Sequence, residues 1–161
     1  MGNFGSCVDN INIPPCFWFV GGEKRNAIAS MVAGTLFFMG WWFIIDAQSV
    51  YPENMSHAYH VCGVFGTLSL FMINAVSNAQ MRGDAYNGGF CGPRGARLWL
   101  FLGFVMGFGS VIASCWILFA NYVSNPAKMP SHWPGFALFF QNVFIFMGSL
   151  IYKFGRVEDQ F

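Results

Sequence analysis

Four long apolar runs separated by short polar segments dominate the pattern along the chain. They cover residues 27–45, 61–76, 98–119 and 134–152, and none of them contains Asp, Glu, Lys, Arg or His. A helix that crosses a bilayer needs roughly 17–25 such residues, and the second run reaches that length only with its flanks, at about 59–78. Because backbone polar groups in lipid must bond within their own segment, the pattern predicts four transmembrane helices.

The composition agrees with a membrane protein and excludes several other classes. Of the 161 residues, 55% are hydrophobic and 9% are charged, whereas a typical soluble domain has about 25% charged residues. We therefore predict an all-α membrane protein with a cytosolic arm at 1–26, a four-helix domain at 27–154 and a cytosolic tail at 155–161. The connecting segments are too short for a soluble catalytic domain. A net charge of +1 does not favour nucleic-acid binding.

Basic side chains gather on one side of the predicted four-span domain, and only Lys128 lies on the other side. The residues on the basic side are Lys24, Arg25, Arg82, Arg94, Arg97, Lys153 and Arg156. Positive side chains stay preferentially on the cytosolic side of a membrane. This distribution predicts that both termini lie in the cytosol.

The third run carries small residues at helical spacing. Gly103, Gly107, Ser110 and Ser114 recur at offsets of 0, 4, 7 and 11, so they share one helix face. Small residues let the backbones of membrane helices approach closely. This face is predicted to pack within the bundle; a surface reserved for another protein is the alternative.

Carboxamides are the most unusual polar groups in the apolar runs. Asn74 and Asn78 belong to the second span, and Gln141 and Asn142 are neighbours in the fourth. Gln141 is expected roughly 10 Å and Asn74 roughly 22 Å below the lumenal surface, so the two are not expected to meet. We predict that the amides join helices within the bundle; contact with a partner subunit or a cargo helix is the alternative.

A second polar group is predicted at the lumenal end, where Asp46, His57 and His60 flank the first connecting loop. Ordinary hydrogen bonding at the membrane interface is favoured over a pH-responsive pair. Two His and one Asp are too few for a metal site to be predicted, and no cofactor is expected. Asn54 opens an Asn-Met-Ser sequence, a possible glycosylation site.

Cysteine and terminal motifs leave further modifications open. Residues 1–6 fit the N-myristoylation pattern, with Gly2 as the acceptor and Cys7 as a possible second acylation site. Cys62 and Cys115 are both expected near lumenal helix ends. Buried free thiols are favoured there over a disulfide.

Catalysis is not predicted. All three His and every carboxylate lie outside the spans or at their ends, which does not suit intramembrane proteolysis, and no ionisable residue lies in mid-membrane for proton-coupled transport.

Several runs resemble the transmembrane protein 50 family of small four-span proteins. They are GEKRN (22–26), GWWFIIDA (40–47), YHVCGV (59–64), MINAVSN (72–78), RGD (82–84), GARLWLF (95–101), WILF (116–119), FFQNVFIF (139–146) and KFGRVED (153–159). The resemblance implies a role in endosomal and late-secretory sorting. It also implies a partner, a second small four-span protein of the leptin receptor overlapping transcript family, as for the fungal vacuolar-sorting relatives. It assigns no catalytic residue.

Together these features predict a non-enzymatic, multi-pass subunit of a small membrane complex in the endosome, Golgi or ER, in contact with lipid and with possible membrane cargo. A channel or carrier subunit and a structural or auxiliary subunit of a larger assembly are the alternatives. Cargo, stoichiometry and exact organelle are not encoded in any recognisable motif.

Overall fold

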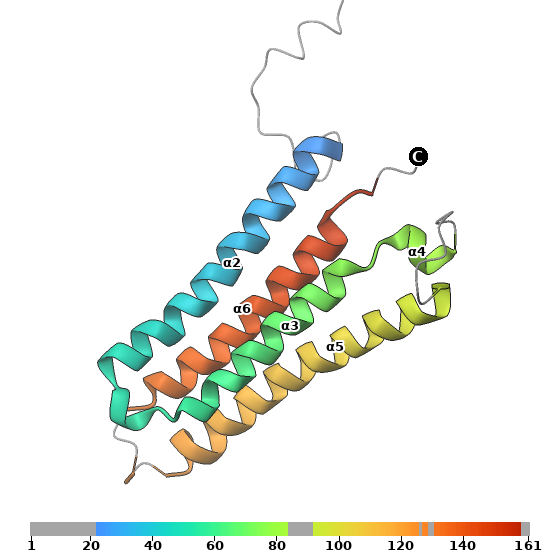
Figure 1. Cartoon of the computed structure of the whole chain (residues 1–161). Coiled ribbons are helices and arrows are strands. Elements are labelled where there is room, and N and C mark those ends of the chain that lie inside the picture. Colours follow the sequence, from blue (N-terminus) through green and yellow to red (C-terminus); the bar gives the residue numbers. More distant parts are fainter. Residues whose placement is uncertain (1–21, 84–91, 126, 129–130, 159–161) are drawn as a thin grey trace, which may run out of the picture.

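The computed structural model describes residues 22–83, 92–125, 127–128 and 131–158 (Figure 1). Within these ranges the regular structure is helical, without strands, and four helical segments are long and apolar enough to cross a membrane. The predicted all-α class is therefore confirmed. The four long helices are α2 (Gly22–Val50), α3 (His60–Ala75), α5 (Gly92–Ile117) and α6 (Trp133–Gly155).

The long helices extend beyond the apolar runs because a helix does not end where the lipid ends. α2 already includes Lys24 and Arg25 and continues past Asp46 to Val50. α6 begins at Trp133 with Pro134 in its first turn, where the missing proline N–H costs no helical hydrogen bond.

The second predicted span, 59–78, is divided in the structure. α3 ends at Ala75, and Ser77 begins the short helix α4 (Asn78–Arg82) with a capping box, in which Ser77 and Gln80 exchange side-chain to backbone hydrogen bonds. Gly83 ends α4 at φ 86°, a left-handed conformation that suits glycine. Asn78 therefore lies outside the helix that holds Asn74.

Short turns and a π-helix lie at the end of the bundle where α2 ends and α3 begins. η2 (Pro52–Asn54) and η3 (His57–Tyr59) are single 3-10 turns between α2 and α3. After Ile117, α5 continues as the π-helix η4 (Leu118–Val123). A π-helix widens the backbone locally and is commonly found near functional sites.

The helices run alternately up and down, so the start of α2 and the end of α6 lie at the same end of the bundle (Figure 1). We call this the terminal end, and the end with η2, η3 and η4 the loop end. α6 packs against α2, α3 and α5, and α3 also packs against α5. α2 packs along α6 and has at most marginal contact with α3 and α5. The bundle is thus a three-helix unit with α2 attached to its central helix.

Large apolar side chains cover much of the outer surface. The most exposed include Met31, Phe38 and Trp42 on α2, and Phe101 and Trp116 on α5. In water such a surface would drive aggregation, whereas in a bilayer it contacts acyl chains. The chain is an integral, multi-pass membrane protein.

Candidate functional site

A layer of buried carboxamides lies in the middle of the bundle. Gln141 and Asn142 on α6 both have 0% relative exposure. Gly63 and Gly66 of α3 lie against them: a Cβ built on Gly63 would be 2.4 Å from Gln141 Nε2, and one on Gly66 would be 3.3 Å from Asn142 Oδ1. The two glycines make the room that the amide side chains occupy.

The hydrogen bonds of this layer are largely local. Asn142 Nδ2 donates to the Leu138 carbonyl four residues earlier in α6, at 2.9 Å. Four buried carboxamide atoms of the described residues make no hydrogen bond: Asn74 Oδ1, Gln141 Nε2, Gln141 Oε1 and Asn142 Oδ1. Since leaving a buried polar group unpaired costs about 1–3 kcal/mol, the layer is not optimised for stability alone.

Asn74 joins α3 to α6 nearer the terminal end. Its Nδ2 donates to the Leu70 carbonyl at 2.8 Å and to Ser149 Oγ on α6 at 3.3 Å. Asn74 thus bonds to Ser149, whereas Gln141 lies against Gly63, so the two amides have different neighbours.

All four small residues singled out on the third run are buried: Gly103, Gly107, Ser110 and Ser114. Ser69 Oγ on α3 donates to the Gly103 carbonyl at 2.7 Å. A Cβ on Gly107 would lie 2.6 Å from Ser69 Oγ and 2.7 Å from the Phe146 ring. This face therefore packs inside the bundle, against α3 and α6.

The contact between α2 and α6 was not predicted from the sequence, and it too is made largely by small residues. The buried small residues of α2 are Ala29, Ala33, Gly40 and Ala47. A Cβ on Gly148 would lie 3.0 Å from the Ala33 carbonyl oxygen, and one on Gly155 would lie 3.0 Å from Ala29 Cβ. The spacing rule that singled out the third run would have found this face as well.

A polar cluster at the terminal end was also missed. Asn26 makes two bonds with the backbone of Val157: its Nδ2 donates to the carbonyl at 3.0 Å, and its Oδ1 accepts from the N–H at 2.7 Å. The Asn78 backbone N–H donates to Glu158 Oε2 at 2.6 Å. We call Asn26, Asn78, Val157 and Glu158 the terminal clamp, because they fix the segment after α6 to α2 and α4.

Basic side chains complete this end. Arg156 forms an ion pair with Glu158 at 3.1 Å, and the buried Lys153 Nζ donates to the Val76 carbonyl at the end of α3. Burial alone would raise the pKa of Glu158, but the Asn78 N–H, Arg156 and Lys153 together lower this pKa below its usual value. Burial likewise opposes the charge of Arg156, and its bonds to Glu158 and Tyr152 raise its pKa overall.

At the loop end, the residues of the predicted polar group do not bond to one another in the described structure. The His60 ring pairs with Gln48 Oε1 at 3.3 Å, while Asp46 and His57 are exposed. Among the described residues no three His, Cys, Asp or Glu side chains are close enough to hold a metal ion. Cys62 and Cys115 are free thiols.

Two tyrosines hold this end together. Tyr122 of η4 is fully buried and donates to the Asn54 carbonyl at 2.8 Å, and Asn121 Nδ2 donates to Tyr59 Oη at 3.0 Å. Asn54, the predicted glycosylation site, is therefore tied through its backbone to the end of α5. The predicted acylation sites Gly2 and Cys7 lie outside the described residues.

Comparison with known proteins identifies the family. A family model described as "Uncharacterised protein family (UPF0220)" matches residues 7–161. A relative from Dictyostelium discoideum, named "Transmembrane protein 50 homolog", is 30% identical over 141 residues, which is 80% of this chain and 88% of the relative. The chain belongs to the transmembrane protein 50 family. No solved structure gives a significant match.

Three of the family runs recognised in the sequence meet at the terminal end. Asn26 closes the GEKRN run, Asn78 closes the MINAVSN run, and Val157 and Glu158 belong to the KFGRVED run. These segments are far apart in sequence and meet in the terminal clamp. Neither of the two family matches names an enzyme.

Proposed function

We propose that this member of the transmembrane protein 50 family is a non-enzymatic subunit of a small membrane complex that assists protein sorting in endosomal and late-secretory membranes. The sorting role follows from the family resemblance of the sequence runs. The partner implied by the same resemblance is a small four-span protein of the leptin receptor overlapping transcript family. Both termini lie in the cytosol in this proposal, which the basic residues at the terminal end support.

The observation that carries the subunit role is the exposed position of α2. α2 has one substantial helix neighbour, α6, whereas each of the other long helices has at least two. Its face opposite α6 carries Met31, Phe38, Trp42 and Ile45, which are 57–72% exposed. We call these four residues the outer face of α2. A partner helix seated on this face would give α2 the second neighbour that it lacks.

Co-purification tests this proposal. The full-length chain is isolated in mild detergent from cells, and the recovered membrane proteins are quantified by mass spectrometry. The double variant Phe38→Ala/Trp42→Ala removes two large side chains of the outer face of α2. We expect it to reduce recovery of the four-span partner about tenfold, since a few large aromatic side chains dominate most interfaces.

The matched control is Phe101→Ala/Trp116→Ala, which removes the same two residue types from the exposed surface of α5. Recovery of the partner with this variant should equal that of the wild type. Equal loss with both variants would refute the α2 interface. If no membrane protein is recovered and the chain is stable and monomeric alone, the subunit role is wrong.

The carboxamide layer favours a channel or carrier subunit as the second candidate. Gln141 and Asn142 offer polar atoms without protein partners, as a permeation path would require. Cysteine placed at Gln141 or Asn74 should react with a water-soluble thiol reagent if water reaches this layer. Because Gln141 is fully buried among side chains, we expect no reaction.

A further inference from the structure

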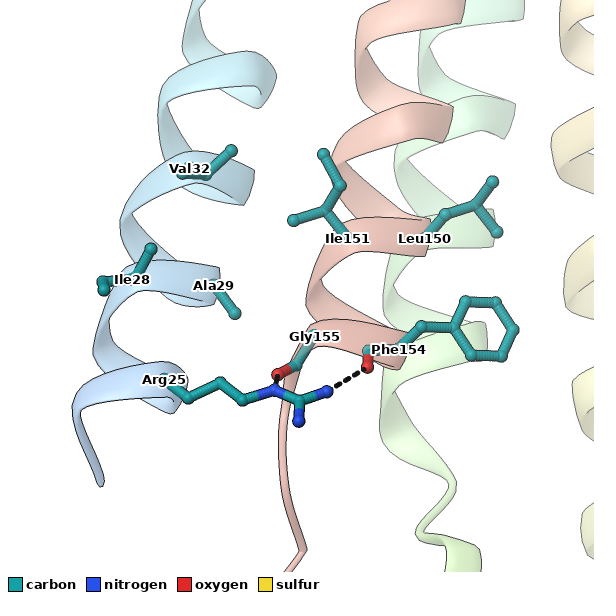
Figure 2. A pocket seen from close by; sticks show the side chains of 8 residues that line it. All are labelled: Arg25, Ile28, Ala29, Val32, Leu150, Ile151, Phe154 and Gly155. Atoms are coloured by element: carbon teal, nitrogen blue, oxygen red, sulfur yellow. Dashed lines mark hydrogen bonds between the residues drawn. The ribbon is translucent and has the colours of Figure 1, made fainter. Parts of the chain in front are cut away.

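A groove lies between α2 and α6 at the terminal end of the bundle. Its volume is about 380 Å³, within the roughly 300–1,000 Å³ that ligand pockets span. Ala29 and Val32 of α2 point toward Ile151 of α6 across it, and Ile28 also lines it (Figure 2). The small pair Ala29 and Gly155 brings the two helices together at its floor.

Arg25 closes the groove at the terminal end. Its side chain crosses from α2 to α6, where Nε donates to the Gly155 carbonyl at 2.9 Å and Nη2 to the Phe154 carbonyl at 3.4 Å (Figure 2). These carbonyls are at the C-terminus of α6, where a positive charge is favourable. The bonds hold the guanidinium at the mouth of an otherwise apolar groove.

Among the described residues, basic side chains outnumber carboxylates around this mouth. Lys24 precedes Arg25 and is exposed, and Arg156 follows the end of α6. The described carboxylates at this end are Glu23, which is exposed in the first turn of α2, and Glu158, which is paired with Arg156.

We propose that this groove binds one anionic phospholipid, with an acyl chain between α2 and α6 and the phosphate on Arg25. Three observations fit this ligand together: the walls are apolar, the groove lies at the end of two membrane helices, and a fixed guanidinium stands at its mouth. A guanidinium binds phosphate oxygens through paired hydrogen bonds. The assignment does not depend on the sorting role, and it holds for whichever leaflet faces the terminal end.

The test is native mass spectrometry of the full-length chain in detergent, titrated with phosphatidylserine or with phosphatidylcholine of the same acyl chains. The wild type should bind phosphatidylserine about fivefold more tightly, since one basic side chain near a membrane surface contributes about that factor. Arg25→Gln should abolish this preference. Lys24→Gln removes the same charge from a neighbouring residue that does not line the groove, and it should keep most of the preference.

A second variant tests the groove itself, independently of Arg25. Val32→Trp places a large ring in the groove from the partly exposed side of α2 and should weaken binding of both lipids. Soluble glycerophosphoserine, which has the headgroup and no acyl chain, should not compete. Thermal unfolding of each variant in detergent checks that the bundle is intact.

Three results would overturn the proposal. Equal effects of Arg25→Gln and Lys24→Gln would show general surface electrostatics, and unchanged lipid binding by Val32→Trp would place the lipid elsewhere. The third is a chain that carries a covalent acyl group at Gly2 and accepts added lipid only after Gly2→Ala. The occupant of the groove would then be the chain's own acyl group.

Discussion

At the scale of single residues, close packing of the helices depends on glycines, which leave room for neighbouring side chains. Gly63 leaves room for Gln141, and Gly107 leaves room for Ser69 and the ring of Phe146. Close approach of this kind replaces the hydrophobic drive that membrane helices lack between each other. The carboxamides contribute differently from the glycines. The side-chain amides of Asn74 and Asn142 donate hydrogen bonds to carbonyl groups of their own helix.

Two glycines of α5 give a matched test of close packing. Gly107→Ala places a Cβ 2.6 Å from Ser69 Oγ, whereas around Gly109 nothing lies within 4 Å of the new atom. Gly107→Ala should destabilise the bundle by about 1–3 kcal/mol through overpacking. Gly109→Ala should be neutral or slightly stabilising, since alanine favours helix. Thermal unfolding in one detergent compares them, and an equal loss in both variants would contradict the packing described.

The carboxamides are predicted to differ in their contribution to stability. Asn74→Ala removes the bond to Ser149, and a double-mutant cycle with Ser149→Ala should give a coupling of about 0.6 kcal/mol, the average for such bonds in membranes. Gln141→Met keeps the shape and removes two unpaired polar atoms, so the unfolding temperature should not fall. A marked loss of stability in Gln141→Met would mean that Gln141 makes a bond to another molecule.

At the scale of the elements, charge and apolar length located the helices but not their ends. Asp46 directly follows the first apolar run, yet α2 continues to Val50 because a helix can extend through the membrane interface. The break between α3 and α4 after Ala75 has a cause that is visible in the sequence, the capping box of Ser77 and Gln80. The π-helix η4 has no such signal. The terminal clamp was not predictable either, because its bonds join groups that are 80 or 131 residues apart in the sequence.

The clamp also gives a prediction for pH. The lowered pKa of Glu158 means that its contribution is complete above the unfolded value of about 4.3 and is lost as the pH falls through the folded value. Hydrogen exchange at the Asn78 amide, which donates to Glu158, should therefore be protected at neutral pH. Protection beyond the intrinsic pH dependence should decrease below about pH 4.

Glu158→Gln is the control for this experiment. The neutral amide keeps an oxygen acceptor and does not titrate, so protection at Asn78 should be weaker at neutral pH and should not change with acidification. If the wild type and Glu158→Gln lose protection in parallel, another group controls the clamp.

At the scale of the whole molecule, three family runs that are far apart in sequence meet at one end of the bundle. The clamp, the lipid groove and most of the basic residues lie at the terminal end, while the loop end holds Tyr59 and the buried Tyr122. The sequence predicted which loops share a side, since that follows from four crossings. It did not predict that α2 would be attached to α6 alone, because helix neighbours depend on which small-residue faces meet. The proposed complex requires this arrangement, because it leaves the outer face of α2 available to a partner helix.

The most direct test of the account is protease access to both chain ends in intact organelles. Epitope tags are placed at each terminus, and a third is placed in the loop between Ser124 and Ser131. After selective permeabilisation of the plasma membrane, added protease should remove both terminal tags and leave the loop tag protected. Protection of either terminal tag, or loss of the loop tag, would contradict four membrane crossings with both ends in the cytosol.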